Sequence, residues 1–124
     1  LGVTRSRRDT ITARLTDAEV LKHGRVHPIN VLVAQRTYTS GQSARGESSW
    51  TPDPAISDAL DAAFYSAYTA VEPAGKRTLL ALDISGSMSS AVSGLPLSCR
   101  EASAALAMVT AATEPEHRII GFTA

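Results

Sequence analysis

Three oxygen-bearing side chains at alternate positions offer the clearest chemistry in this sequence, in the segment Asp83-Ile84-Ser85-Gly86-Ser87-Met88. A carboxylate and two hydroxyls are hard donors, which suit Mg²⁺, Mn²⁺ or Ca²⁺ better than Zn²⁺. Alternate spacing lets a tight loop turn Asp83, Ser85 and Ser87 toward one point, and Gly86 relieves the backbone strain of such a turn. The pattern predicts a divalent-cation site with Mg²⁺ as the expected ion. A polar turn without metal is the alternative.

The residues around this loop predict a strand–helix–strand unit. Residues 78–82 form a short apolar run typical of a strand buried on both faces, and residues 117–122 form a second strand. Between them, Ser98-Cys99-Arg100-Glu101 has the form of a capping box that opens an Ala-rich helix over 99–112. We expect a βαβ unit with a right-handed crossover. Ligands of open α/β sheets bind beyond the carboxyl ends of the strands, where the loop at 83–88 lies.

The first half of the chain predicts helices. Thr16-Asp17-Ala18-Glu19 has the form of a second capping box, with the Thr16 hydroxyl as the cap. The short helix it opens is expected to end near His23, with Gly24 in the left-handed conformation.

Two longer helices are expected to follow. One begins at Pro28, places Ile29, Leu32 and Val33 on one face, and stops at Gly41. Residues 41–55 are rich in Gly, Pro and Ser and predict a loop, which the single tryptophan anchors to a neighbouring surface. The clearest amphipathic helix comes next, and its apolar positions are Ile56, Leu60, Phe64, Ala67, Tyr68 and Val71. Residues 72–76 then predict a hinge.

Composition limits the classes of protein to which the chain could belong. Its 124 residues are 44% hydrophobic and carry zero formal net charge. The apolar runs are far shorter than the roughly 18 residues that a membrane helix needs, so no membrane partner is expected. A single cysteine, Cys99, excludes an internal disulfide framework and a Cys-only zinc site. With no export signal visible, we expect a cytoplasmic location.

The charge is unevenly distributed along the chain. Residues 1–50 carry a net charge of +4, residues 51–76 carry −3, and residues 77–124 carry −1. A basic front half points weakly to a polyanionic partner, and solvated helix faces are the alternative. The candidate phosphate contacts are Lys22, Arg25 and Arg36. No acid/base pair accompanies Ser85, so the sequence does not predict an enzyme.

The predicted strand–helix–strand unit is incomplete as a fold. Two parallel strands with one helix leave a sheet face and both edges uncovered, although parallel sheets are stable almost only when both faces are covered. We therefore expect this chain to be a segment of a longer protein.

Longer stretches of the sequence resemble a known family. LLALDISGSM is similar to the start of a von Willebrand factor A domain, whose metal-ion-dependent adhesion site begins with this D-x-S-x-S signature. Two longer stretches resemble the Ro (TROVE-domain) RNA-binding autoantigen family in its bacterial branch. They are KHGRVHPINVLVAQRTY and then SSWTPDPAISDALDAAFYSAYTAVEPAGKRTLLALDISGSM. The resemblance runs from about Asp17 to Ala124. It rests on RVHP, W-x-PD, DAAFY, VEP-x-GKR and D-x-SGSM in order.

The resemblance implies both a fold and a function. Residues 1–76 would be the end of a ring of HEAT-like helical repeats, and residues 77–124 the N-terminal part of a Rossmann-like α/β von Willebrand A domain. Proteins of this family bind Y RNAs on the outside of the ring and thread misfolded noncoding RNAs through its hole, in RNA quality control. Asp83, Ser85 and Ser87 match the family's first metal loop, whose companion loops would follow Ala124. The alternative function is an A-domain scaffolding module whose metal loop grips a carboxylate of a protein partner.

Overall fold

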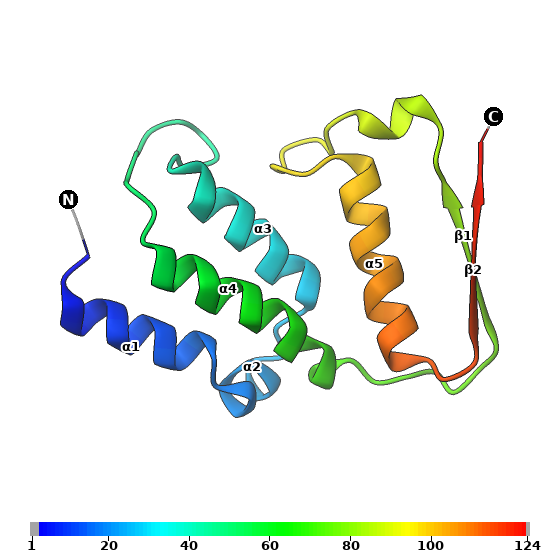
Figure 1. Ribbon diagram of the computed structural model, residues 1–124, viewed down its shortest axis with the longest axis horizontal. Coiled ribbons are helices and arrows are strands. Elements are labelled where there is room, and N and C mark those ends of the chain that lie inside the picture. The colour runs from blue at the N-terminus through cyan, green and yellow to red at the C-terminus, as the bar shows by residue number, and fades with distance from the viewer. Residues whose placement is uncertain (1–2, 124) are drawn as a thin grey trace. The chain divides into compact units, whose positions relative to one another are not determined.

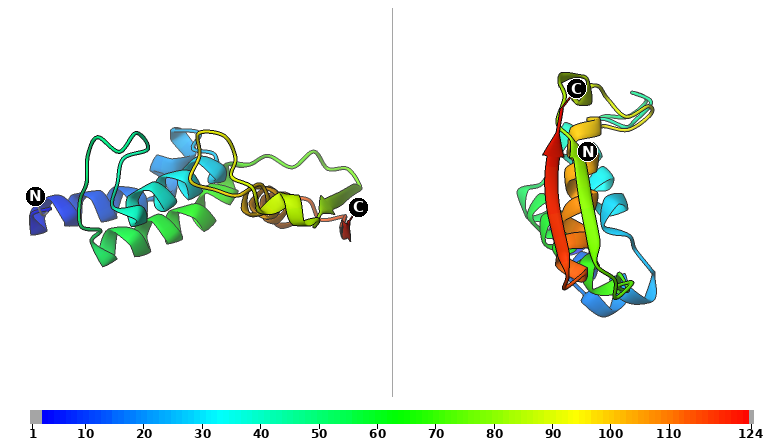
Figure 2. Two further views of the ribbon diagram at one scale, coloured as in Figure 1. Left: turned by 90° about the horizontal axis from the view of Figure 1, so that it is seen from above. Right: turned by 90° about the vertical axis from the view of Figure 1, so that its right-hand side faces the viewer.

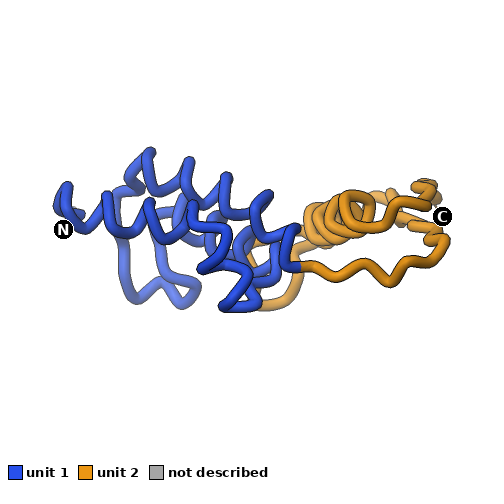
Figure 3. The backbone as a smooth tube through the Cα atoms, turned by 90° about the horizontal axis from the view of Figure 1, so that it is seen from below, with its two compact units in different colours: residues 1–70 blue, residues 71–124 orange. Residues whose placement is uncertain are grey.

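The computed structural model describes residues 3–123, which fall into two compact units. The first unit spans residues 1–70 and the second spans residues 71–124 (Figure 3). The boundary lies just before the segment predicted as a hinge. No helix among the described residues is long and apolar enough to cross a membrane.

The first unit is helical, and α4 is its centre. Its helices are α1 (Arg5–Leu15), α2 (Ala18–His23), α3 (Pro28–Ser40), α4 (Pro54–Ser66) and the 3₁₀ turn η1 (Ala67–Ala70). Helix α4 lies between α1 and α3 and packs against both (Figure 1). Apolar side chains recur on it every three or four residues, so that one face is buried: Ile56, Ala59, Leu60, Ala63 and Phe64. The predicted amphipathic helix is confirmed, although its last turn narrows to η1.

The predicted cap of α2 is wrong by one residue. Asp17 is the cap, and its carboxylate oxygen Oδ1 accepts the amides of Glu19 (3.0 Å) and Val20 (3.3 Å). The Thr16 hydroxyl instead donates to the carbonyl of Thr12 at 2.9 Å, in the last turn of α1. Helix α1 ends directly before α2, so the end of one helix takes the hydroxyl that the start of the next would need.

The end of α2 also differs from the prediction. Gly24 keeps a right-handed conformation, with φ −73°, because its amide continues the helix by donating to Val20. The left-handed residue is Arg25, with φ 49°, whose amide donates to the carbonyl of Lys22 at 3.0 Å. A non-glycine residue in this conformation costs about 1–2 kcal/mol.

Helix α3 begins and ends as predicted but turns a different face inward. Pro28 occupies its first turn, and Gly41 ends it with φ 69°. Its buried residues are Pro28 and Val31, whereas the three predicted residues Ile29, Leu32 and Val33 are only half-buried. The face of α3 that contacts α4 contains Val31 and, one turn further on, Gln35. The Nε2 of Gln35 donates to Asp61 Oδ1 of α4 at 3.1 Å.

The loop between α3 and α4 is anchored by the single tryptophan, as predicted. Trp50 stacks on Tyr38 with ring centroids 6.2 Å apart, and its Nε1 donates to the Tyr38 carbonyl at 2.9 Å. The Tyr38 hydroxyl in turn accepts the amide of Asp53 at 2.9 Å. Tyr38, near the end of α3, therefore holds the end of the loop that leads into α4.

The second unit is a strand–helix–strand unit. Its elements are β1 (Thr78–Asp83), the 3₁₀ turn η2 (Gly86–Ser89), α5 (Cys99–Thr113) and β2 (His117–Phe122). The strands pair in parallel, from Thr78 opposite His117 to Asp83 opposite Phe122, and α5 lies to one side of them (Figures 1 and 2). The predicted capping box of α5 is present: the Ser98 hydroxyl accepts the Glu101 amide, and the Glu101 carboxylate accepts the Ser98 amide. The βαβ prediction is confirmed.

β1 is only half-buried or exposed along its length, contrary to the expectation of a strand buried on both faces, and β2 is exposed. Every residue of β2 is exposed, and Leu79 in β1 is 63% exposed. Ile119, Ile120 and Phe122 are each about half-exposed. Among the described elements, α5 is the helix that packs against the strands. The sheet is therefore left partly uncovered, as expected for two parallel strands with a single helix.

Candidate metal loop and nucleic-acid interface

The candidate metal loop starts at Asp83, the last residue of β1, so it lies at the carboxyl end of the strand as predicted. The half-buried Asp83 receives two hydrogen bonds on the same oxygen, Oδ1: one from the Ser85 amide at 2.9 Å and one from the Ser85 hydroxyl. Within the described part of the chain, the other oxygen, Oδ2, accepts no hydrogen bond. The alternate spacing therefore does bring Asp83 and Ser85 together at the carboxyl end of the strand.

The electrostatics of the loop favour a charged carboxylate. The hydroxyl of Ser85, and then its amide, stabilise the ionised form of Asp83 and hold the pKa of that carboxyl below its ordinary value. The carboxylate is therefore ionised at neutral pH, as a metal ligand must be.

Ser87 is placed differently from the other two residues of the pattern. It is exposed and lies in η2, which follows directly after Ser85. The 3₁₀ turn uses the loop's backbone, since the Met88 amide donates to the Ser85 carbonyl at 3.1 Å and the Ser90 amide to the Ser87 carbonyl at 3.0 Å. The structure shows a contact between Asp83 and Ser85, and none that includes the Ser87 side chain among the described residues.

The donor set fits part of a divalent-cation site. One carboxylate and two hydroxyls supply hard oxygens, and Mg²⁺ takes six. No group of three or more His, Cys, Asp or Glu residues in the described range is placed to hold a metal ion. In this chain, a cation at the loop would therefore depend on Asp83 with the serine hydroxyls.

A cationic residue beside the loop was missed by sequence reasoning. Arg100, in the first turn of α5, donates from Nη2 to the Ser85 carbonyl at 3.5 Å. The crossover brings that turn back to the loop, where the Cys99 amide donates to the Ser90 carbonyl at 2.8 Å. Fifteen residues separate Arg100 from Ser85, so no local pattern signals the contact. The guanidinium places a positive charge next to the candidate cation site.

The three predicted phosphate contacts are all exposed, and two of them are neighbours. Lys22 ends α2 with His23, and Arg25 lies in the following turn, joined to Lys22 by a backbone hydrogen bond of 3.0 Å. Arg36 lies on α3, eight residues beyond Pro28, which at 1.5 Å per residue is about 12 Å along the helix axis. The structure thus shows a basic turn formed by Lys22 and Arg25, with Arg36 on a different element.

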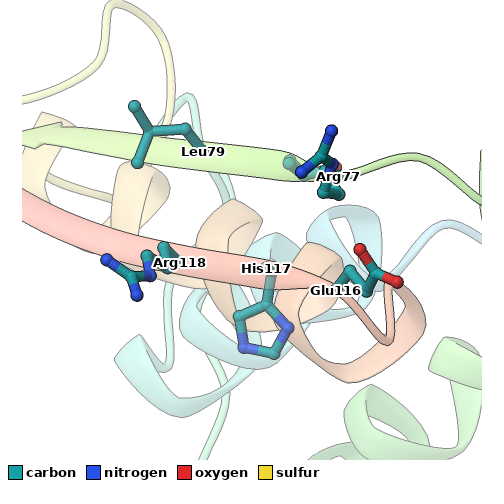
Figure 4. A pocket seen from close by; sticks show the side chains of 6 residues that line it. Arg77, Leu79, Glu116, His117 and Arg118 are labelled. Atoms are coloured by element: carbon teal, nitrogen blue, oxygen red, sulfur yellow. The ribbon is translucent and has the colours of Figure 1, made fainter.

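The second unit also has a shallow depression at the ends of the strands opposite the candidate metal loop. It has a volume of about 430 Å³ and is lined by Arg77, Thr78, Leu79, Glu116, His117 and Arg118 (Figure 4). The lining comes from the start of β1 and the start of β2, so this depression does not form part of the loop at Asp83.

Comparison with known proteins connects both units to one family. Residues 77–124 match the family model of the Ro60 vWA domain. The chain is 47% identical over 114 residues to the RNA-binding protein RO60 of Caenorhabditis elegans, covering 92% of this chain and 18% of the relative. It is 45% identical over 114 residues to the RNA-binding protein RO60 of Deinococcus radiodurans, covering 90% of this chain and 22% of the relative.

A solved structure agrees with these sequence matches. The crystal structure of the Deinococcus radiodurans Ro protein (RSR) superposes with a TM-score of 0.89 at 42% identity, over 98% of this chain and 25% of that chain. The chain thus spans about a fifth of the length of the curated relatives that it matches. The matches confirm the resemblance inferred from RVHP, DAAFY and D-x-SGSM, and they extend across both units. Across both units, the chain is therefore similar in sequence and fold to proteins of the Ro family.

Proposed function

We propose that this chain is an RNA-binding segment of a Ro-type ribonucleoprotein, with Y RNA-like and misfolded noncoding RNAs as its ligands in RNA quality control. The observation that carries the proposal is the identity of 45–47% over 114 residues to two proteins named RNA-binding protein RO60. The helical unit would belong to a HEAT-like ring. The role is binding rather than catalysis, in the cytoplasm.

Charge and exposure support a phosphate contact at the basic turn. Lys22 and Arg25 are exposed and adjacent, and both lie in a part of the chain with net charge +4 over residues 1–50. Side chains of this kind bind the RNA backbone by releasing its counterions, so affinity falls as salt rises. Arg36 adds a third positive charge on α3.

The test is to measure RNA affinity against salt concentration for a variant with Lys22, Arg25 and Arg36 all changed to Ala. Each lost phosphate contact on a single strand reduces the slope of log affinity against log salt by about 0.7. The triple variant should therefore lose about 2 from the slope and at least tenfold in affinity. The assay is fluorescence anisotropy with a structured noncoding RNA.

A matched control separates local contacts from total charge. The variant with Arg5, Arg7 and Arg14 of α1 changed to Ala loses the same charge from three exposed positions of the first unit. If both triple variants lose the same affinity and slope, the phosphate contact is not specific to the basic turn. If the Lys22, Arg25 and Arg36 variant binds as tightly as the unchanged protein, these residues are solvated surface charges.

A second function is favoured by the loop at Asp83. We propose that it forms part of a metal-dependent protein-binding site, in which Asp83 supplies charge and Ser85 and Ser87 supply hydroxyl oxygens. When bound, Mg²⁺ would supply positive charge for a carboxylate of a protein partner. Support comes from the ionised Asp83 carboxylate and from its open Oδ2 in the described structure. Arg100 beside Ser85 adds a second positive group for an acidic partner.

Calorimetric titration of the protein with Mg²⁺ tests this site. Asp83→Ala should abolish binding because it removes the carboxylate of the loop, whereas Ser85→Ala and Ser87→Ala should weaken binding by a smaller factor. Zn²⁺ should bind more weakly than Mg²⁺, since the loop offers no nitrogen or sulfur ligand. Asp58→Ala, at an exposed position of α4, is the control for loss of one acidic residue. Equal Mg²⁺ affinity in the Asp83→Ala and Asp58→Ala variants would leave the loop as a polar turn.

A further inference from the structure

Glu114 is an unusual residue for its position. It is 5% exposed and is the one charged residue buried among those that the structure describes. It follows the last residue of α5, where its own amide donates to the Thr110 carbonyl at 2.8 Å. Burying a carboxylate without compensation is costly, so its partners indicate why it is there.

The partners of the Glu114 carboxylate lie at the start of the second unit, in residues 71–77, which lead from the unit boundary to β1. Its Oε1 accepts the amide of Ala74, and its Oε2 accepts the amide of Gly75 at 3.1 Å. Two consecutive backbone amides thus donate to the two oxygens of one carboxylate. Hydrogen bonds to an ionised acceptor are about twice as strong as those between neutral groups. Gly75 adopts φ 66°, a left-handed conformation that glycine takes without steric cost.

The residues that follow Glu114 strengthen the same attachment. The Glu114 carbonyl contacts His117 Nδ1 at 2.8 Å, which ties the end of α5 to the first residue of β2. The Thr78 amide donates to the Glu116 carbonyl at 2.9 Å, where β1 begins. Residues 74–78 are therefore held at both ends, by the Glu114 carboxylate at one end and by the sheet at the other.

We propose that Glu114 is a latch that sets how many residues are free at the start of the second unit, in the segment 71–77 that leads from the unit boundary to β1. With the latch closed, this segment is held from Ala74 onward, and residues 71–73 alone form the tether between the unit boundary and the first held residue. With it open, the tether extends through residues 71–77, up to the start of β1. At about 3.3–3.6 Å per residue, the maximum span grows from about 10 Å to about 24 Å. Glu114 therefore acts by holding the backbone of residues 74 and 75 in place.

Hydrogen exchange of the Ala74 and Gly75 amides tests the latch in the purified protein. Glu114→Gln keeps the volume of the side chain but has one acceptor oxygen in place of two, and its NH₂ group faces one of the two amides. We expect exchange at these two amides to become at least tenfold faster. Trypsin should also cleave faster after Lys76 and Arg77, which are both exposed.

Glu116→Gln is the matched control. Glu116 is an exposed glutamate two residues away, and its contact with Thr78 is made by its backbone carbonyl, which the substitution keeps. Exchange at Ala74 and Gly75 should be unchanged in this variant. The proposal is overturned if Glu114→Gln leaves both amides as protected as before. It is also overturned if the amides of β1 and α5 lose protection to the same degree, because Glu114 would then stabilise the whole unit rather than latch the segment 71–77.

Discussion

Substituting Gly41 tests how the loop between α3 and α4 is closed. Gly41 has φ 69°, its carbonyl accepts the Trp50 amide at 2.9 Å, and a Cβ built on it would lie 2.7 Å from the Trp50 carbonyl oxygen. Real Cβ atoms essentially never approach a heavy atom within 3.0 Å, so the two backbones would have to separate. Gly41→Ala therefore adds both conformational strain and a steric clash.

Gly46 in the same loop provides a matched comparison. It has φ 71°, and no atom lies within 4 Å of a Cβ built there. Gly46→Ala carries the left-handed strain of about 1–2 kcal/mol, offset by about 0.4–1 kcal/mol because alanine restricts the unfolded chain. We expect it to lower the free energy of unfolding by about 1 kcal/mol. Gly41→Ala carries the same strain and adds about 1–3 kcal/mol for the enforced shift. Its total should be about 2–4 kcal/mol.

Urea denaturation followed by the fluorescence of Trp50 measures the difference. Trp50 is the single tryptophan and lies in the first unit with both glycines, so its signal reports on that unit. With an m-value of about 1 kcal/mol/M, the midpoint of Gly41→Ala should fall at least about 1 M below that of Gly46→Ala. Equal midpoints for the two variants would refute the steric argument. They would show that the backbone at Trp50 moves aside without cost.

Three further substitutions test the packing and the caps. Tyr68→Phe should raise the free energy of unfolding by about 1 kcal/mol, because the Tyr68 hydroxyl is buried without a hydrogen-bond partner among the described residues. Burial, and then the charge of Tyr65, raise the pKa of Tyr68 above its ordinary value, so the unfolded chain loses this proton first and stability should fall above about pH 10. A pH series of urea midpoints should show this decline in the unchanged protein and less of it in Tyr68→Phe. Leu60→Ala, in the buried face of α4, should cost about 2–5 kcal/mol by the same measurement. Ser98→Ala removes the cap of α5 and should cost about 1 kcal/mol, seen as faster hydrogen exchange in the first turn of that helix.

Local signals in the sequence predicted most of the elements. Proline at the start and glycine after the end defined α3, and the apolar spacing defined α4. The pair Ser98 and Glu101 predicted the start of α5, because both groups of a capping box lie within one turn. These features depend on residues within about four positions of each other, so the order of amino acids is enough to recognise them.

Where neighbouring elements compete for the same residue or surface, only the tertiary structure shows which interaction forms. Thr16 and Asp17 are both good caps, and the choice fell to Asp17 because the end of α1 takes the Thr16 hydroxyl. The buried line of α3 runs through Val31 because α4 packs there, and a helix with apolar residues on several sides does not reveal which side has a neighbour. The left-handed residue after α2 is Arg25 rather than Gly24, and the conformational preference of glycine did not decide it.

The candidate site likewise has features that the sequence predicts and features that only the tertiary structure decides. The sequence by itself determined that Asp83 and Ser85 would lie at the end of a strand, since the contact between them spans only two residues. The tertiary structure alone decided that Arg100 stands beside this loop, and that the carboxylate of Glu114 reaches the amides of Ala74 and Gly75 about forty residues earlier. Contacts of that separation form only when the crossover through α5 returns the chain to β1. Their partners are backbone amides and carbonyls, which every residue carries, and so no residue type marks them in the sequence.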